Sequence, residues 1–119
     1  MERIPMSICI TAMEDNIDCK VDQRFGRCKY FIFVDPETLK YEAINNPALS
    51  ESGGVGIKAA SAVLKYSPEA IITGLIGDNA IKVLQTANAG VYSCKDVTVR
   101  EAVALYKDGK LERLDTANN

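Results

Sequence analysis

A short basic segment, residues 20–29 (KVDQRFGRCK), has the side chains best suited to hold a ligand. Its positive charges outnumber its one carboxylate, and the charged residues are Lys20, Asp22, Arg24, Arg27 and Lys29. Arginine donates paired, charge-assisted hydrogen bonds to anions. We therefore predict that Arg24 and Arg27 bind an oxyanion or a negatively charged cluster. The alternative is a solvated loop whose arginines pair with surface carboxylates.

Two glycine-rich turns could supply backbone N–H donors to the same ligand. Gly53, Gly54 and Gly56 come before a predicted helix, and Gly74 and Gly77 lie between a predicted strand and the next helix. Helix amino termini present free N–H groups and a partial positive charge. Because the spacing is not GxGxxG, we do not expect a dinucleotide site. The alternatives are a flexible helix entry at the first turn and a tight structural turn at Gly74.

The chain has four cysteines, Cys9, Cys19, Cys28 and Cys94, and thiolates are natural ligands for iron–sulfur species. No two of them form a CxxC pair, so a zinc ribbon is not expected. Cys9 lies within a predicted buried strand and is assigned to the core. Cys28, between Arg27 and Lys29, is the candidate metal ligand, and Cys19 and Cys94 are further candidates.

Several kinds of catalysis are excluded by composition. The chain has no histidine, which excludes His-dependent triads and His-ligated zinc. The first predicted strand contains the run SICITA without a carboxylate, whereas a two-metal nuclease needs several. No pairing of a nucleophile with a base is visible. We therefore expect a protein that is not an enzyme.

The whole-chain numbers indicate one soluble globular domain over residues 1–119. Hydrophobic residues make up 47% and charged residues 25% of the 119. The formal net charge of −2 gives no general attraction to nucleic acid. No apolar run reaches the roughly 20 residues of a membrane span, and the first residues do not match a signal peptide. We expect a cytoplasmic protein with free thiols.

The elements that must position these residues follow from hydrophobic periodicity. Strands are predicted over residues 4–13, with Pro5 at the entrance, and over 30–35, 39–45, 70–72 and 90–93. Helices are predicted over 55–66 and 99–107, the latter starting with a capping box formed by Thr98 and Glu101. Another helix is predicted between Asp78 as N-cap and Gly90 in the C′ position.

This order of elements predicts a three-layer α/β fold. Right-handed crossovers place the helices on both faces of a five-stranded mixed sheet. We predict the strand order 3-2-1-4-5, with strand 2 antiparallel to the rest. In open α/β sheets, ligands bind beyond the carboxyl ends of the strands.

Three stretches resemble the dinitrogenase iron–molybdenum cofactor biosynthesis family: residues 21–35 (VDQRFGRCKYFIFVD), 45–60 (NNPALSESGGVGIKAA) and 72–92 (ITGLIGDNAIKVLQTANAGVY). Residues 98–111 (TVREAVALYKDGKL) resemble its usual last helix. The resemblance covers nearly the whole chain, in order. It implies a ribonuclease H-like fold and a protein that carries the iron–molybdenum cofactor, or its iron–sulfur precursor, during nitrogenase assembly.

The chain departs from the pattern of this family at two places. Arg24 stands where cofactor-binding relatives commonly have a histidine before the Phe-Gly pair. The residues before the glycine-rich turn are Ser50, Glu51 and Ser52, where some relatives have a histidine. At residues 24–27 the resemblance therefore extends to the backbone and the positive charge, but not to metal ligation by an imidazole.

Together these observations predict a non-catalytic carrier of an anionic metal–sulfur cofactor, with cofactor-assembly proteins as partners and no nucleic-acid or membrane partner. The alternative is a metal-free regulatory or scaffold domain that recognises a phosphate or carboxylate. Cys28 is the expected metal ligand. The expected cofactor-binding residues are Arg24, Phe25, Gly26, Arg27, Cys28, Gly53, Gly54, Gly56, Gly74 and Gly77.

Overall fold

The computed structural model describes residues 7–119. Its elements are β1 (Ile8–Ala12), β2 (Tyr30–Val34), β3 (Tyr41–Asn45), α1 (Val55–Leu64), β4 (Ala70–Thr73), α2 (Asp78–Thr86), β5 (Gly90–Ser93), α3 (Val99–Lys107) and β6 (Glu112–Arg113). The predicted start of the first strand, including Pro5, lies outside the described residues. The helices within residues 7–119 are too short or too polar to cross a membrane.

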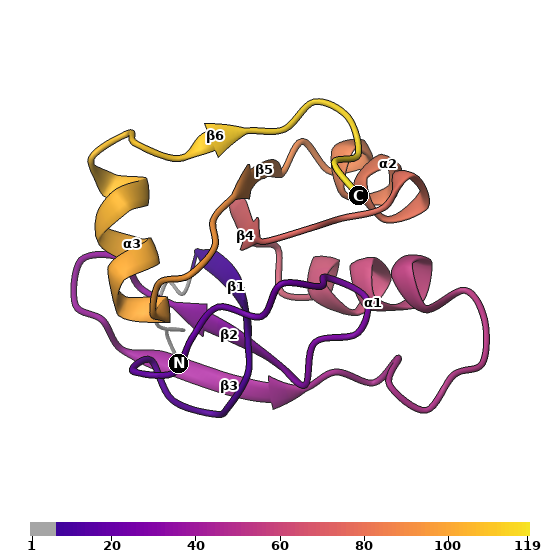
Figure 1. Ribbon diagram of the computed structural model, residues 1–119, viewed down its shortest axis with the longest axis horizontal. Helices are drawn as coiled ribbons and strands as arrows, with labels where there is room; N and C mark the ends of the chain where they lie inside the picture. Colours follow the sequence, from indigo (N-terminus) through magenta and orange to yellow (C-terminus); the bar gives the residue numbers. More distant parts are fainter. Residues whose placement is uncertain (1–6) are drawn as a thin grey trace.

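The strands form one mixed sheet in the order β3-β2-β1-β4-β5-β6 (Figure 1). β1, β4 and β5 are parallel, and β2 is antiparallel to β1 and β3. The predicted order of the first five strands is confirmed. The predicted number of strands is wrong, because Glu112 and Arg113 pair antiparallel with Ser93 and Tyr92 of β5. A two-residue polar strand has no hydrophobic alternation, so the pattern could not reveal it.

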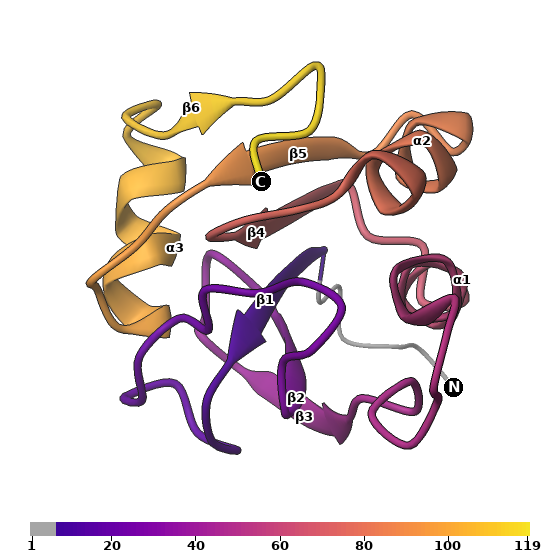
Figure 2. The ribbon, with the colours of Figure 1, turned by 45° about the vertical axis from the view of Figure 1, so that its right-hand side comes forward.

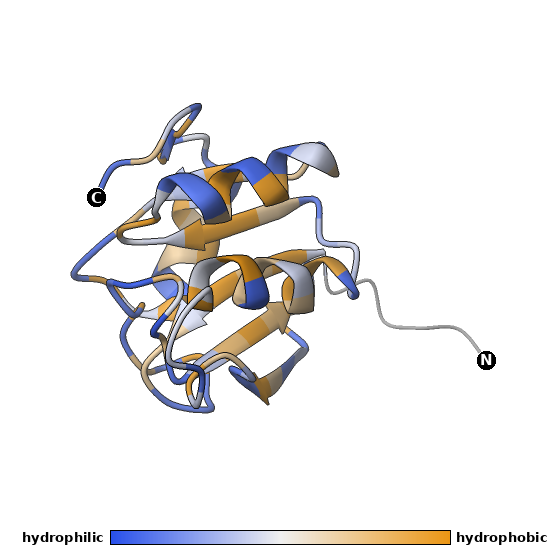
Figure 3. Cartoon of the chain, turned by 90° about the vertical axis from the view of Figure 1, so that its right-hand side faces the viewer, coloured by the Kyte–Doolittle hydropathy of each residue, from blue (hydrophilic) through white to orange (hydrophobic). Residues whose placement is uncertain are grey.

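Helices cover both faces of the sheet, as predicted (Figure 2). On one face α1 and α2 pack over the sheet, and Leu84 of α2 belongs to the same apolar cluster as Ile71. On the other face Val103 of α3 belongs to a cluster with Ile10 and Ile72. Every residue of β1 is buried, as expected for a central strand. Figure 3 shows apolar residues concentrated along the sheet, which separates the two clusters.

The helix ends agree with the sequence in one case and differ in another. The capping box of α3 is confirmed: Thr98 Oγ1 accepts from the N–H of Glu101 at 3.1 Å, and the Glu101 carboxylate accepts from the N–H of Thr98 at 2.8 Å. The predicted cap of α2 is wrong, because Gly77 is the N-cap and Asp78 begins the helix. α2 also ends earlier than predicted, at Thr86, and Gly90 belongs to β5.

Several loops leave the sheet at the same edge. β1 ends there at Ala12, which pairs with Tyr30 at the start of β2. Tyr30 also pairs with Asn45 at the end of β3, and β4 ends beside β1 at Thr73. Residues 13–29, 46–54 and 74–77 therefore all begin or end at the edge where α/β sheets bind ligands.

Candidate anion-binding cleft

A cleft of about 510 Å³ opens at this edge, between the basic loop (residues 20–29) and the first turns of α1 and α2. Its lining residues are Arg24, Phe25, Gly26, Arg27, Gly54, Val55, Gly56, Ile57, Leu75, Gly77, Asp78, Asn79, Ala80 and Asn119. Residues far apart in the sequence thus line one cleft, and separate hydrogen bonds hold each side of it in place.

Asp22 anchors the basic loop to the end of β1. Its N–H donates to the carbonyl of Thr11 at 2.8 Å, and its own carbonyl accepts from Thr11 Oγ1 at 2.8 Å. The Oγ1 atoms of Thr11 and Thr73 lie 2.9 Å apart, which joins β1 to β4 at the same level. The Asp22 carboxylate accepts from the N–H of Arg24 at 3.0 Å. The loop therefore enters the cleft in a defined conformation.

A short pairing then joins the basic loop to residues 74–77. The N–H of Leu75 donates to the carbonyl of Gln23 at 2.6 Å, and the N–H of Phe25 donates to the carbonyl of Leu75 at 3.0 Å. Gly74 is buried beneath Gln23. Gly74 therefore has the structural role that the sequence left open, and it is absent from the residues that line the cleft.

Asn46 holds the other end of the basic loop. Its buried side-chain amide donates to the carbonyls of Gly26 and Cys28, each at 3.0 Å. Its Oδ1 atom accepts from the N–H of Ala48 at 2.9 Å, which fixes the turn after β3. This role was not predicted from the sequence. The signal available was an Asn-Pro pair next to a strand end, because asparagine readily bonds the backbone two residues on.

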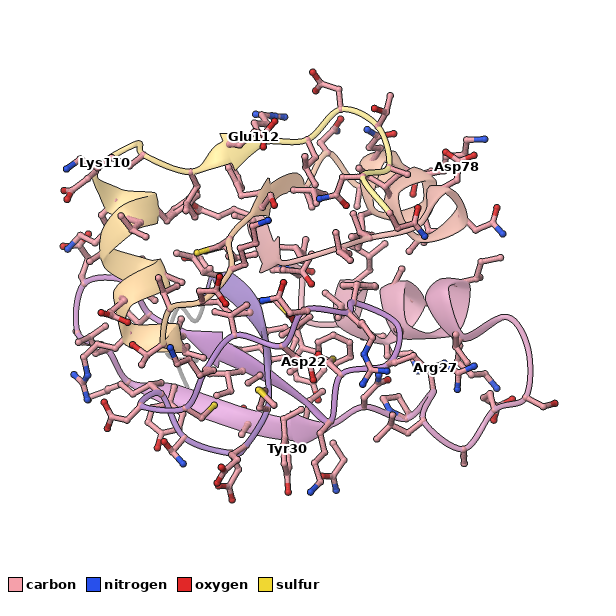
Figure 4. The ribbon with its side chains drawn as sticks, in the orientation of Figure 1. Asp22, Arg27, Tyr30, Asp78, Lys110 and Glu112 are labelled. Atoms are coloured by element: carbon pink, nitrogen blue, oxygen red, sulfur yellow. The ribbon has the colours of Figure 1, made fainter. Side chains whose placement is uncertain are left out.

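The two arginines of the cleft differ in their partners. The Arg24 side chain is 66% exposed, and its Nε atom lies 4.0 Å from the Asp22 carboxylate. Within residues 7–119, the ion pairs do not include Arg27. Figure 4 shows Arg27 on the side of the molecule where α1 and α2 begin. A weak ion pair at Arg24, and none at Arg27 among the described residues, leave both guanidinium groups able to bind an external anion.

Both helices that border the cleft begin without a side-chain cap. Gly54 is the N-cap of α1 and Gly77 is the N-cap of α2, and neither has a side chain that could bond the first-turn N–H groups. The positive ends of two helix dipoles therefore face one hollow. The carboxylate of Asp78 in the first turn of α2 opposes an anion, but it lies 3.3 Å from Lys82 Nζ, which offsets part of its charge.

The structure brings together most of the residues predicted for the site. Arg24, Gly26 and Arg27 of the basic loop line the cleft with Phe25, and Gly54, Gly56 and Gly77 line it from the helix starts. The Phe25 ring is buried and packs on Phe31 at 5.5 Å between ring centroids, so it forms part of the floor. Gly53 borders a neighbouring hollow instead, which Lys58 and Lys65 line.

Cys28 requires a correction. The sequence placed its thiol in the site as a metal ligand, but the side chain is 0% exposed and belongs to the apolar cluster beneath α1 and α2. The side-chain amide of Asn46 lies 3.8 Å from its Sγ atom. Burial raises the pKa of the Cys28 thiol well above its ordinary value, which disfavours the thiolate needed for ligation. In this conformation Cys28 is a core residue. The apolar pattern of β2 could not show that the segment leading into this strand, where Cys28 lies, is also buried.

The donor set of the cleft suits an anion better than a bare metal ion. Among the residues that the structure describes, no cluster of three or more His, Cys, Asp or Glu side chains could hold a metal ion. The cleft instead combines guanidinium groups, backbone N–H groups and the carboxamides of Asn79 and Asn119. Leu75 and Ile57 add exposed apolar surface, 44% and 45% of each residue. These four residues were not predicted from the sequence, because their contribution depends on loops meeting in space.

The fold and the cleft define a small three-layer α/β protein with a candidate anion-binding cleft at the carboxyl edge of a mixed sheet. The chain belongs to the dinitrogenase iron-molybdenum cofactor family, whose sequence model matches residues 6–109.

Two proteins are similar to the chain over most of its length. A solved structure of the apo form of the orange protein from Desulfovibrio gigas is 34% identical and superposes with a TM-score of 0.90, over 94% of this chain and 95% of that one. An uncharacterized protein of Methanocaldococcus jannaschii is 31% identical over 99 residues, which is 81% of this chain and 84% of the relative.

Proposed function

We propose that this protein is a non-catalytic carrier that binds a preassembled anionic metal–sulfur cofactor, of the iron–molybdenum or iron–sulfur precursor type, and passes it to an assembly partner. The observation that carries this proposal is the convergence of Arg24, Arg27 and two uncapped helix starts on one cleft. The family name supports the class of cargo. The similar orange protein was solved in an apo form, which implies a bound group that can be absent, and this also supports the proposal.

Charge would hold the cargo. A sulfide-rich cluster carries negative charge on its surface, and guanidinium and N–H groups donate to such a surface without displacing its metal ligands. Arg24 and Arg27 would approach from the basic loop, and the first turns of α1 and α2 from the opposite side. The exposed apolar surface of Leu75 and Ile57 would exclude water from part of the contact and strengthen these interactions.

Attachment by charge also suits release. A cluster held by thiolate ligands leaves only when metal–sulfur bonds exchange, whereas hydrogen bonds and ion pairs break without such chemistry. Because Cys28 is buried, we propose that the cluster binds with its own sulfide shell intact. The shallow position of the cleft at the sheet edge would leave one side of the cargo open to a receiving protein.

Anaerobic titration with isolated iron–molybdenum cofactor, followed by absorbance and by co-elution in size-exclusion chromatography, tests the proposal. Arg24→Ala and Arg27→Ala should each weaken binding about tenfold, and more when combined, because each removes charge-assisted hydrogen bonds. Lys110→Ala is a matched control, since it removes one positive charge far from the cleft (Figure 4). Absence of binding by the wild-type protein would refute the proposal.

Two further arms distinguish the remaining alternatives. Cys28→Ala should leave binding within about twofold, since no charge-assisted contact is lost; loss of binding with an intact fold would instead indicate direct thiolate ligation. The metal-free alternative rests on the same donors, which fit any small anion. It would be favoured if phosphate or a dicarboxylate saturated the cleft in calorimetry while the metal cofactor did not bind.

A further inference from the structure

We infer that residues 114–119, named here the strap, bring Asn119 into the lining of the cleft, so that Asn118 positions residues 74–77 and Asn119 contacts the bound anion. This inference rests on the proposed function for the identity of the ligand. The family model ends at residue 109, so the strap lies beyond the part of the chain that it matches.

The strap is attached to the body of the protein at its start. The N–H of Leu114 donates to the carbonyl of Val91 at 2.8 Å, which continues the pairing of β6 with β5. The Leu114 side chain is buried in the cluster beneath α1 and α2. The carbonyl of Asp115 then accepts from the side-chain amide of Gln85, on α2, at 2.8 Å. These contacts direct the chain along α2 toward the cleft.

Asn118 pairs with the turn that precedes α2. Its Oδ1 atom accepts from the N–H of Ile76 at 2.8 Å, and its Nδ2 atom donates to the carbonyl of Gly74 at 3.0 Å. Its own N–H donates to the carbonyl of Ile76 at 3.2 Å. Asn118 alone thus forms hydrogen bonds with the backbone N–H and carbonyl of Ile76 and with the carbonyl of Gly74. The same turn pairs with the basic loop through Leu75, so Asn118 braces the backbone that positions Arg24.

Asn119 lies at the amino end of α2. A Cβ atom added to Gly77, the N-cap of that helix, would come within 3.2 Å of Asn119 Nδ2, and Asn119 is among the residues that line the cleft. Figure 1 shows residue 119, marked C, beside α2. A carboxamide there stands beside the uncapped N–H groups of α2 and offers a neutral donor to the same anion.

The positioning role of Asn118 is tested on the ligand-free protein by amide hydrogen exchange. Asn118→Ala removes the acceptor of the Ile76 N–H, so exchange at Ile76 should accelerate about tenfold or more. Thr116→Ala, in an exposed part of the strap, is the control and should leave Ile76 unchanged. Unchanged protection at Ile76 in Asn118→Ala would overturn the positioning role.

The contact by Asn119 is tested by titration with isolated iron–molybdenum cofactor. Asn119→Asp should weaken binding about tenfold, because a carboxylate at the cleft repels an anion, and Asn119→Ala about threefold. Thr116→Asp places the same charge on the strap outside the cleft and should bind within about twofold of wild type. Equal affinities for Asn119→Asp and Thr116→Asp would overturn the contact while leaving the proposed function standing. Failure of the wild-type protein to bind would overturn the proposed function and the contact together, with the role of Asn118 decided by exchange.

Discussion

The backbone of Gln23 lies directly against Gly74, so that a Cβ atom on Gly74 would stand 2.7 Å from both the Cα and the carbonyl oxygen of Gln23. This approach lets the Leu75 N–H reach the Gln23 carbonyl at 2.6 Å. Arg24 follows Gln23 immediately. The position of Arg24 in the cleft therefore depends on Gly74, on another loop, having no side chain.

Replacing Gly74 with alanine should therefore damage both stability and binding. The new methyl group would meet backbone, which cannot rotate away, and overpacking of this kind costs about 1–3 kcal/mol. Urea denaturation should show the loss, and titration with the cofactor should show weaker binding because Arg24 is displaced. Gly53→Ala is the control, because nothing lies within 4 Å of a Cβ there and its stability should change little. Equal stability of the two variants would contradict the assigned role of Gly74.

Removal of the Asn46 side chain should loosen the other end of the basic loop. Asn46→Ala leaves the buried carbonyl of Cys28 and that of Gly26 without their donor, at a cost of about 1–3 kcal/mol. Chemical denaturation measures the cost, and Asn45→Ala, at an exposed neighbouring position, is the matched control. If both variants unfolded at the same urea concentration, the bracing role of Asn46 would be wrong.

Burial of the Cys28 thiol should make stability depend on alkaline pH. The folded state holds the pKa of Cys28 well above the value of about 8.5 that a free thiol has in the unfolded chain. Below that value both states bind the proton, and the contribution to stability is complete. Above it the unfolded state releases the proton first, so stability falls as pH rises, by up to about 1.4 kcal/mol per pH unit for each such thiol.

Urea midpoints measured from pH 7 to pH 10 check this dependence. Cys28→Ala should show a shallower decline than the wild type, and a remaining slope is expected because burial also raises the pKa of Cys9. A thiol-specific reagent at pH 8 gives a second measurement: Cys28 should react only on unfolding, and the partly exposed Cys19 should react in the folded protein. Rapid labelling of Cys28 in the native state would contradict its burial.

Loss of the α3 cap should separate stability from binding. Thr98→Ala removes the acceptor of the Glu101 N–H, which should cost about 1 kcal/mol in denaturation. α3 covers the face of the sheet opposite α1 and α2, and none of its residues lines the cleft. Cofactor affinity should therefore equal that of the wild type; a parallel loss of affinity would show that the cleft depends on the packing of α3.

The sequence predicted the local elements well, because periodicity and caps are local properties. The fully apolar run of β1 placed it at the sheet centre, and Thr98 with Glu101 marked the start of α3 correctly. The prediction that Asp78 caps α2 was wrong because it relied on residue type. Asp is a good capping residue, but Gly77 already has the extended conformation of an N-cap. β6 escaped detection because its two residues are exposed and polar.

The candidate site was predicted in part, for a related reason. Arg24 and Arg27 were visible as charges, and the glycines as helix entries, and the structure places most of them together. Cys28 was assigned as a metal ligand from its chemical type. Residue type does not indicate that Asn46 and the packing of β2 enclose the thiol. Asn119 could not be found, because its place beside Gly77 depends on the path of residues 114–118 over α2.

The paired starts of α1 and α2 have a thermodynamic consequence for the empty protein. Like-signed dipole ends held side by side repel each other, and with no capping side chain only the Asp78 carboxylate in the first turn of α2 compensates part of that repulsion in the folded state. A bound anion would reduce this repulsion and stabilise the folded state against heat. Each tenfold rise in the free anion concentration above its Kd would add about 1.4 kcal/mol to the free energy of unfolding. Under the proposed function, the melting temperature should therefore rise with the fraction of the protein that has its cleft occupied.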